Sequence, residues 1–386
     1  MTRSFGRVHD VGDMREAARR RLPKGLFDFI DRGCDQDVAA RGNVAAFDRV
    51  KMVPHALVDV SQRSTAGTML GKAHAMPLAV APTGVAGLVW FRGELELARA
   101  AAAANGPFTL ATRSMSSIEA IASQAGGTLW FQLYPSNDRE LSRSMLERAT
   151  KAGFEALVVT VDTPTVPSRT YNEKNGFSIS FKFKPRFVGD VLLHPRWLAG
   201  VIGRYVANGG LPRFENLPGR RSILKGAPPS TMLDGTVNWE MVRELRRQWP
   251  NKFVIKGILR PSDAVKAVEH GADAVIVSNH GGRNLDASPP PIEVLPRVVE
   301  AIGARADVLV DSGIRRGGDI AKALALGASG VLAGRATLYG AAAGGQAGAG
   351  HVLDILQREL HTTMGLLGCA SIADLDGKFL YRKDGG

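Results

Sequence analysis

The sequence alternates short runs rich in β-branched residues with longer stretches rich in alanine, leucine and charged residues. This alternation is typical of repeated strand–helix units around a parallel sheet. Stretches between the runs, such as 94–104, 117–125 and 138–153, fit helices. Eight candidate strands can be identified, at residues 77–84, 108–112, 129–134, 156–162, 253–257, 274–279, 307–313 and 330–335.

The spacing of these strands constrains the architecture. Most of the intervals between successive strand starts accommodate one strand, one helix and two loops. Eight such units predict an α/β fold, a closed (β/α)8 TIM barrel. An open, doubly wound sheet is the alternative, but no GxGxxG motif follows the first strand, which favours the barrel.

Two segments do not fit the repeat. The strand at residue 253 begins 97 residues after the strand at residue 156, which requires an insertion of roughly 70 residues. The stretch at 19–33 predicts a helix that caps one end of the barrel. We expect a single domain over 1–386, with an N-terminal helical extension at 1–70 and an insertion after the fourth strand at 178–235.

Polar side chains follow every candidate strand. In a barrel of this kind the functional groups lie at the carboxyl ends of the strands. Any one of these residues could be a hydrogen-bonded core residue, but packing alone does not explain one at each strand end. Together they predict a site formed by Thr83 and Gly84, Thr112 and Arg113, Gln132 and Tyr134, Thr160 and Asp162, Lys256, Ser278 and His280, Asp311 and Gly313, and Gly334 and Arg335.

Three stretches near these ends carry further signals. The stretch VSNHGGRNLD at 277–286 puts His280 and Arg283 three positions apart, directly after an apolar run. The stretches at 311–319 and 332–340 each combine a glycine turn with an arginine at a helix start, where N–H groups and guanidinium charge would hold a phosphate. Two ordinary turns with glycine at positive φ are the alternative. The sequence therefore predicts a phosphorylated ligand with an acid–base histidine above it.

The charge of the chain points to an anionic partner. The formal net charge is +12, and residues 181–226 hold nine Lys and Arg against Asp190 and Glu215. Basic residues mixed with aromatic ones suit an element that docks on anionic lipid, whereas a lid over the site is the alternative. Nucleic-acid binding also fits the charge, but we find no recognition motif for it.

The sequence also bears on the compartment. No apolar region follows the N-terminus, and no run approaches 18 apolar residues. The two cysteines, Cys34 and Cys369, lack the spacing of a CxxC motif or a metal site. We therefore expect a reduced, cytoplasmic chain without a metal, with a peripheral position on the inner face of the cell membrane as the alternative.

A series of motifs resembles those of a known family. LPKGLFDF, APTG, FQLY, TVDTP, SNHGGRNLD, DSGIRRGGD and GRATLYG occur in order between Leu22 and Gly340. Together they resemble the FMN-dependent 2-hydroxy-acid oxidases and dehydrogenases, which include glycolate oxidase, L-lactate dehydrogenase and mandelate dehydrogenase. LVDVSQRS and LHPRW are most similar to the bacterial, membrane-associated mandelate dehydrogenases.

The resemblance implies catalytic roles. His280 would be the base that takes a proton, from carbon or from the hydroxyl group, as a 2-hydroxy acid becomes a 2-keto acid. Asp162 would hold and stabilise its imidazole. Arg169 and Arg283 would clamp the substrate carboxylate.

The same resemblance implies how FMN is held. Lys256 would stabilise the negative charge that develops on the flavin, and Tyr134 would donate to the substrate. The residues implied in FMN binding are Pro82, Thr83, Gly84, Ala111, Gln132, Thr160, Lys256, Ser278, Asp311, Gly313, Arg315, Gly334 and Arg335.

Four positions refine the expected substrate and electron acceptor. Phe29 stands where the family usually has a tyrosine that meets the carboxylate, and Ala111 replaces a serine that usually helps bind the flavin. Arg113 occupies a position that often lines the substrate pocket with an apolar or aromatic residue, so a larger or dianionic substrate is expected. Gly84 stands where oxidases commonly have alanine, which favours a dehydrogenase.

The resemblance implies a quinone, another carrier or O2 as the electron acceptor, and commonly a homotetramer. Two other functions remain as alternatives. One is a different phosphate-binding barrel, such as an isomerase, against which the pair His280 and Arg283 argues. The other is a basic barrel that has lost catalysis, as Phe29 and Ala111 could suggest.

Overall fold

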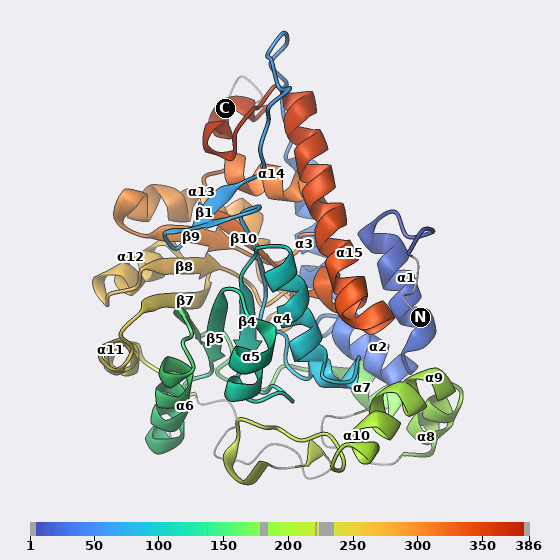
Figure 1. Cartoon of the computed structure of the whole chain (residues 1–386). Coiled ribbons are helices and arrows are strands. Elements are labelled where there is room, and N and C mark those ends of the chain that lie inside the picture. The colour runs from blue at the N-terminus through green and yellow to red at the C-terminus, as the bar shows by residue number, and fades with distance from the viewer. Residues whose placement is uncertain (1–4, 137, 178–183, 221, 224–234, 382–386) are drawn as a thin grey trace.

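The computed structural model describes residues 5–136, 138–177, 184–220, 222–223 and 235–381. Eight parallel strands close into a barrel in the order β10-β3-β4-β5-β6-β7-β8-β9 (Figure 1). Closure is made where Val331 of β10 pairs with Leu78 of β3. The predicted (β/α)8 barrel is confirmed. The strands are β3 (Leu78–Val80), β4 (Phe108–Ala111), β5 (Leu129–Leu133), β6 (Ala156–Thr160), β7 (Lys252–Ile258), β8 (Ala274–Val277), β9 (Asp307–Val310) and β10 (Gly330–Ala333).

Helices cover the outside of the barrel (Figure 1). Side chains of Ser117, Asp138 and Asn238 accept N–H groups of the first turn and so fix where α5, α6 and α11 begin. The long α15 bends where Gly345 takes a φ of 61°. These helices are α4 (Gly93–Ala103), α5 (Ile118–Ala125), α6 (Arg139–Lys151), α11 (Trp239–Gln248), α12 (Pro261–Glu269), α13 (Pro291–Ile302), α14 (Gly317–Ala325) and α15 (Arg335–Leu367).

The strands are buried on both faces, which explains their continuous apolar runs. Alternate residues such as Val158, Val254 and Ile276 fill the barrel interior, and their neighbours pack against the helices. A hairpin of β1 (Gly67–Met69) and β2 (Lys72–His74) inserts Met69 into the interior cluster. The barrel interior is therefore a packed core rather than a channel.

The N-terminal segment forms α1 (Val11–Arg21), α2 (Lys24–Asp31) and α3 (Val38–Arg49). The single helix predicted at 19–33 is wrong, because Leu22 is extended and Pro23 caps a second helix. Proline has no N–H group and disfavours a helical conformation in the residue before it. The break turns α2 toward the carboxyl ends of the barrel strands, where its last carbonyl groups meet Arg283.

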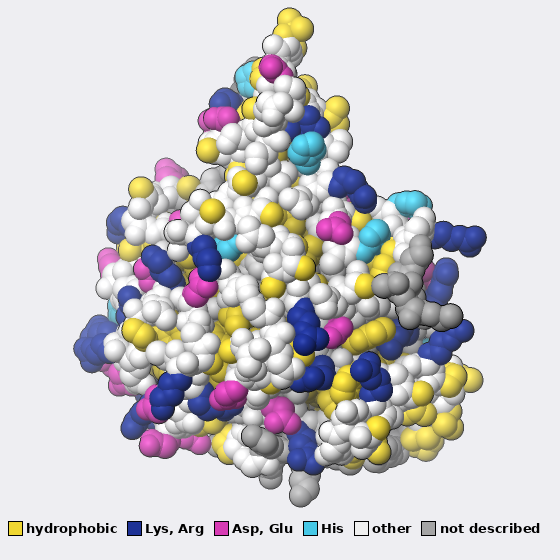
Figure 2. Space-filling view, in the orientation of Figure 1, with side chains coloured by type: hydrophobic (Ala, Val, Ile, Leu, Met, Phe, Trp, Pro, Cys, Tyr) yellow, Lys and Arg dark blue, Asp and Glu magenta, His cyan; other side chains and the backbone are white. Residues whose placement is uncertain are grey.

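The insertion after β6 contains α7 (Thr170–Asn175), α8 (Pro185–Leu192), α9 (Pro195–Trp197), a π-helix (Leu198–Gly203) and α10 (Arg204–Ala207). Hydrophobic side chains gather over α8 to α10 on the face drawn in Figure 2. Parts of the predicted insertion, at 178–183, 221 and 224–234, lie outside the described residues. Among the described residues, no helix combines the length and the apolar character needed to cross a membrane.

Candidate active site

The loops after β6 and β8 bring together the histidine and the aspartate. His280 Nδ1 lies 2.9 Å from Asp162 Oδ1, and His280 Nε2 lies 3.3 Å from the hydroxyl oxygen of Tyr134. Burial alone would raise the pKa of Asp162, but the charge and hydrogen bond of His280 lower it below its ordinary value. The carboxylate therefore stays ionised at neutral pH, and its charge stabilises the protonated imidazole.

The backbone around His280 is held by polar groups that sequence reasoning missed. Asn43 and Asn279, both buried, exchange two side-chain hydrogen bonds of 2.8 and 2.7 Å, and Asn279 Oδ1 also accepts the N–H of Gly282. Asn284 Nδ2 donates to the backbone carbonyl of Asp162. These amides join chain segments far apart in sequence, so spacing alone gave no signal for them.

The buried lysine lies beside this histidine loop. Lys256 Nζ is 2.9 Å from Asp311 Oδ2 and donates to Ser278 Oγ at 2.8 Å. Burial alone would lower the pKa of Lys256, but the charges of Asp311 and Asp162 outweigh burial and raise it. Ser278 Oγ also accepts the N–H of His280. Asp311, expected to meet the ribityl chain, is thus also the ion-pair partner of Lys256.

Two guanidinium groups flank the histidine. Arg169 Nη2 donates to the carbonyl of Arg283 at 3.2 Å, and both guanidinium groups lie over the ring of Phe29, at 5.9 and 5.0 Å. Arg169 Nε is buried without a hydrogen-bond partner among the described residues. Burial and then the charge of Arg169 lower the pKa of Arg283 to about 10. Because two adjacent buried cations are costly, this corner of the site suits an anion.

The predicted residues on β4, β5 and β6 form one hydrogen-bonded wall. Gln132 Nε2 donates to Thr160 Oγ1 at 3.1 Å, and Gln132 Oε1 accepts the N–H of Thr112. Arg113 lies 5.8 Å from the centre of the Tyr134 ring. Ala111 is buried at the end of β4. The structure therefore brings Arg113 next to the pair of Tyr134 and His280.

The two helix starts predicted to bind phosphate differ. At α14, Asp319 accepts the N–H of Arg316 at 2.9 Å and Glu359 accepts the N–H of Gly317 at 2.7 Å, so this start is already occupied by carboxylates. Phosphate binding by Gly313 and Arg315, in the loop before α14, stays a prediction. At the start of α15, the N–H of Leu338 donates to the carbonyl of Gly334, which is a backbone bond of the helix. The N–H groups that precede Leu338 in the first turn are available to a ligand.

The side chain of Arg335, predicted to bind phosphate, contacts backbone carbonyl groups. The guanidinium of Arg335 donates to the carbonyls of Ile30, Gly281 and Arg32 at 3.2, 2.8 and 2.9 Å. Carbonyl groups at the end of α2 lack helical partners and attract cations, which explains this placement. The backbone of Arg335 remains at the start of α15.

The remaining predicted residues lie around the same opening. Gly84 is exposed, Pro82 and Thr83 are half-buried, and Arg315 is partly buried with Nη1 donating to the carbonyl of Ile314. Gly313 has a φ of 115°, and a Cβ there would lie 2.5 Å from the carbonyl oxygen of Asn43. Gly313 therefore allows close contact between the loop after β9 and α3.

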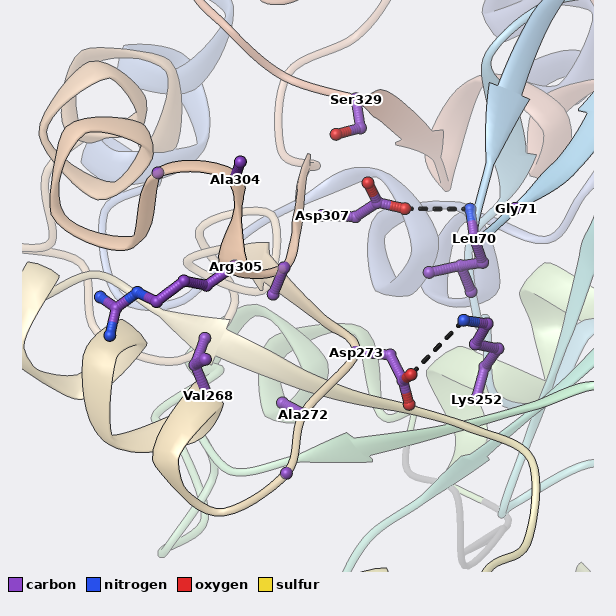
Figure 3. Close-up of a pocket in the computed structure, with 13 residues that line it drawn as sticks. Leu70, Gly71, Lys252, Val268, Ala272, Asp273, Ala304, Arg305, Asp307 and Ser329 are labelled. Carbon is purple, nitrogen blue, oxygen red and sulfur yellow. Dashed lines mark hydrogen bonds and ion pairs between the residues drawn. The ribbon is translucent and has the colours of Figure 1, made fainter.

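Two hollows in the described part of the chain differ in how close they lie to this site. One of about 600 Å³ lies at the amino ends of β7, β8 and β9, where Lys252 pairs with Asp273 and Asp307 accepts the N–H of Leu70 (Figure 3). Arg305, which also lines it, donates to the carbonyls of Ile302 and Ala301. The charged groups of this hollow thus already bind protein partners and it is at the opposite end from His280, so we assign it no chemistry. A smaller one of about 50 Å³ borders the site and is lined by Tyr134, Pro135, Thr160, Val161, Thr163, Pro164 and Val237.

The chain is similar to known proteins over nearly its whole length. A family model described as FMN-dependent dehydrogenase matches residues 18–382. An (S)-mandelate dehydrogenase from Pseudomonas putida is 41% identical, covering 97% of this chain and 94% of that protein. An L-lactate oxidase from Nostoc is 39% identical, covering 95% and 96%. A crystal structure of a monotopic membrane protein, (S)-mandelate dehydrogenase, has a TM-score of 0.91 at 40% identity and covers 97% of this chain and all of that chain.

Proposed function

The chain belongs to the family of FMN-dependent dehydrogenases, and from this premise we propose that it oxidises an (S)-2-hydroxy acid to the 2-keto acid and passes the electrons to a quinone or another carrier. The observation that carries the proposal is the paired His280 and Asp162 beside the adjacent guanidinium groups of Arg169 and Arg283.

The residues at the strand ends fit FMN. The first N–H groups of α15 suit its phosphate, with Arg315 nearby in the loop after β9. Gln132, Thr160 and Ser278 supply hydrogen-bonding groups, and Lys256 supplies a fixed cation for the flavin. Held by these residues, FMN would supply the acceptor for the two electrons that leave the hydroxy acid.

Proton removal falls to His280. With Nδ1 held by Asp162, its Nε2 faces the Tyr134 hydroxyl and is the nitrogen that would take a proton from the substrate. The Asp162 carboxylate stabilises the imidazolium that results. His280 therefore acts as the base, Asp162 orients it, and Tyr134 donates a hydrogen bond to the substrate.

Substrate orientation falls to the arginines. A carboxylate bound between Arg169 and Arg283 would pair their charges and satisfy the buried Nε of Arg169. Phe29 contributes its ring and a backbone carbonyl, which accepts from Arg283 Nη1 at 2.7 Å, but no hydroxyl group. The missing hydrogen bond to a charged group corresponds to about 1.5–3 kcal/mol, so we expect small 2-hydroxy acids to bind more weakly here.

Arg113 supports a preference for a larger or dianionic substrate. Its guanidinium is next to Tyr134, which itself contacts the proposed base. A substrate with a second negative group could meet this cation. A panel of 2-hydroxy acids tests the idea, and it would be wrong if mandelate or lactate outperformed every larger or dianionic acid.

The residue at position 84 bears on the electron acceptor. Gly84 supports a dehydrogenase, and a Cβ at this position would lie 3.9 Å from Arg113 Cβ, so alanine would also fit in the protein alone. The alternative is an O2-dependent oxidase that forms H2O2, which the similarity to an L-lactate oxidase supports.

We also propose a membrane-facing role for the insertion, with the enzyme peripheral on the inner face of the cell membrane and assembled as a homo-oligomer. Val188, Leu192, Leu193 and Val206 of the insertion are exposed. Hydrophobic side chains gather on this part of the surface in Figure 2. Exposed apolar side chains next to basic ones suit an anionic lipid surface. A carrier in the membrane could then reoxidise the flavin.

One experiment tests the core of the proposal. Purified protein is mixed anaerobically with (S)- and (R)-2-hydroxy acids while flavin absorbance near ~450 nm is followed, and is then reoxidised with O2 or with a quinone. We expect bleaching by (S)-acids and faster reoxidation by the quinone. Colourless protein that does not bind FMN would contradict the proposal.

A further inference from the structure

We propose that Glu94 is a positioning residue for the flavin site: its buried carboxylate holds the loop after β3 and the loop after β4 together, and so sets where Gly84 and Arg113 stand. The inference rests on the proposed function, because those two residues are assigned to flavin and substrate. Glu94 itself is not among the residues assigned to proton transfer or binding.

The carboxylate joins the two loops directly. Glu94 is 1% exposed and lies in the first turn of α4. Its Oε1 accepts the N–H of Gly87 at 3.0 Å and the N–H of Met115 at 3.1 Å. Its Oε2 lies 3.4 Å from Ser116 Oγ, which donates to it. Gly87 belongs to the loop after β3, and Met115 and Ser116 belong to the loop after β4.

The joined loops meet where the site residues stand. Val85 N–H donates to the carbonyl of Arg113 at 3.2 Å, and a Cβ on Gly84 would contact Arg113 Cβ at 3.9 Å. Val85 has a φ of 58°, a left-handed conformation that β-branched residues rarely adopt. Such a conformation persists only where the surroundings hold it. Here the N–H of Val85 is bound to Arg113, and the N–H of Gly87, two residues later, is bound to Glu94.

Two aromatic residues of the insertion contact the loop after β3. A Cβ on Gly87 would lie 2.6 Å from the Tyr205 hydroxyl oxygen and 2.8 Å from Met115 Cβ, so Gly87 has no room to move between them. Tyr205 also accepts the N–H of Arg92 at 3.2 Å, and Trp197 Nε1 donates to the carbonyl of Leu88 at 2.7 Å. The loop after β3 is therefore held on one side by Glu94 and on the other by the insertion.

The length and the charge of the Glu94 side chain can be tested separately. Both N–H groups bind the same oxygen of Glu94, so Glu94→Gln keeps that acceptor. It loses the charge and the oxygen that accepts the long bond from Ser116 Oγ. Glu94→Asp keeps the charge, but its side chain is shorter by one methylene group and cannot reach both loops. If Glu94 acts by position, the Asp variant is impaired and the Gln variant is not.

The experiment measures the FMN dissociation constant of the apoprotein and the visible absorption spectrum of the bound flavin for both variants. We expect Glu94→Asp to weaken FMN binding by roughly tenfold and to shift the spectrum, and Glu94→Gln to stay within about threefold of the unmodified protein. Glu96→Gln is the matched control, because Glu96 lies in the same turn and binds Gln346 N–H instead of the site loops. We expect it to leave both readouts unchanged.

Hydrogen exchange separates this inference from the proposed function. In apoprotein, the amides of Gly87 and Met115 should exchange roughly tenfold faster in Glu94→Asp than in Glu94→Gln, whatever the protein binds. If Glu94→Asp does not fold, Gly87→Ala pushes the same loops apart without changing Glu94 and should weaken FMN binding similarly.

Three results would overturn the proposal. They are normal FMN binding and spectrum in Glu94→Asp, equal impairment of both Glu94 variants, and normal binding in Gly87→Ala. Failure of the unmodified protein to bind FMN would instead contradict the proposed function. The exchange rates of the Gly87 and Met115 amides would still test whether Glu94 holds the two loops together.

Discussion

His280 is held in an unusual backbone conformation. Its φ is 59°, and Gly281 and Gly282 after it also have positive φ. A left-handed conformation is uncommon outside glycine, and it persists here because Ser278, Asn279 and Ser312 bind the loop. The strained turn fixes the imidazole between Asp162 and Tyr134. At the scale of single residues, the backbone of the His280 loop is strained, and hydrogen bonds from neighbouring side chains offset the cost of that strain.

At this scale we predict the effect of Asp162→Asn. Thr163 Oγ1 donates to Asp162 Oδ1 at 3.0 Å, so the amide oxygen of asparagine should take the place of Oδ1 and still accept from His280 Nδ1–H. The substitution removes the negative charge that stabilises the imidazolium. We expect kcat to fall roughly 10²-fold with a smaller change in KM, measured by steady-state kinetics at several pH values. Thr163→Val, which removes the hydroxyl group but keeps the charge, is the control, and an equal loss in both variants would contradict the charge argument.

Individual elements place these residues through local irregularities. Strand β7 pairs Lys256 with Ile276 and then Ile258 with Val277, so Gly257 is bulged out of the ladder. Gly257 has a φ of 106°, and a Cβ there would lie 2.5 Å from Asp162 Cβ. The bulge therefore lets the loop after β6 bring Asp162 against the end of β7. A regular strand would push Asp162 away from His280.

Gly257→Ala tests the bulge. The substitution combines a strained φ with a steric clash, so we expect the free energy of unfolding to fall by more than ~1 kcal/mol and activity to fall with it. Chemical denaturation and kinetics measure both. Gly71→Ala is the control, because Gly71 has a φ of 83° but open space around the added methyl group. Similar activity losses in both variants would refute a special role for Gly257.

A second element-scale prediction concerns pH. His74 on β2 is buried, and neither ring nitrogen has a hydrogen-bond partner among the described residues. Burial lowers the pKa of His74, with partial opposition from the Asn105 backbone. The neutral form is therefore favoured in the folded state, so its contribution to stability is full above the ordinary pKa near 6.5 and is lost as pH falls below it.

We expect the melting temperature of His74→Leu, relative to the unmodified protein, to rise as the pH falls from 8 to 5.5. Thermal unfolding across that range measures the difference. A difference that does not change with pH would mean that His74 does not contribute to the acid sensitivity of the fold.

At the scale of the whole molecule, charge and apolar surface meet on the insertion. Leu192 and Leu193 are 66% and 80% exposed, while Phe187 of the same helix is buried against Phe177. One face of α8 thus packs on Phe177, and the other faces solvent. The N–H of Gly25 at the start of α2 is 3.2 Å from Asp190, which ties the insertion to the helix that carries Phe29.

We predict that replacing Leu192 and Leu193 by serine reduces binding to vesicles that contain phosphatidylserine by at least about tenfold, because burial of each leucine in lipid contributes about 1.5–3 kcal/mol when complete. Co-sedimentation measures it. Leu57→Ser is the control, because Leu57 is fully exposed in the loop between α3 and β1, far from the insertion in Figure 1. Unchanged binding of the double variant would contradict a membrane-facing insertion.

The apolar runs predicted the strands well because burial on both faces demands continuous apolar residues, although β6, β8 and β9 end before the polar residues that follow them. The helix at 19–33 was mispredicted because the apolar pattern continues through Pro23. At the start of α14, the N–H of Gly317 binds Glu359, a residue of α15 that local sequence does not connect to it.

The sequence by itself determined the barrel, the order of its units and the set of polar residues at the strand ends, because hydrophobic periodicity and strand ends are local properties. Only the tertiary structure decided how those residues pair. The bonds from Asn43 to Asn279, from Arg335 to the end of α2 and from Glu94 to two loops join segments distant in the chain. Such partners are chosen by the closed barrel, which brings together groups whose separation in sequence carries no information about their distance.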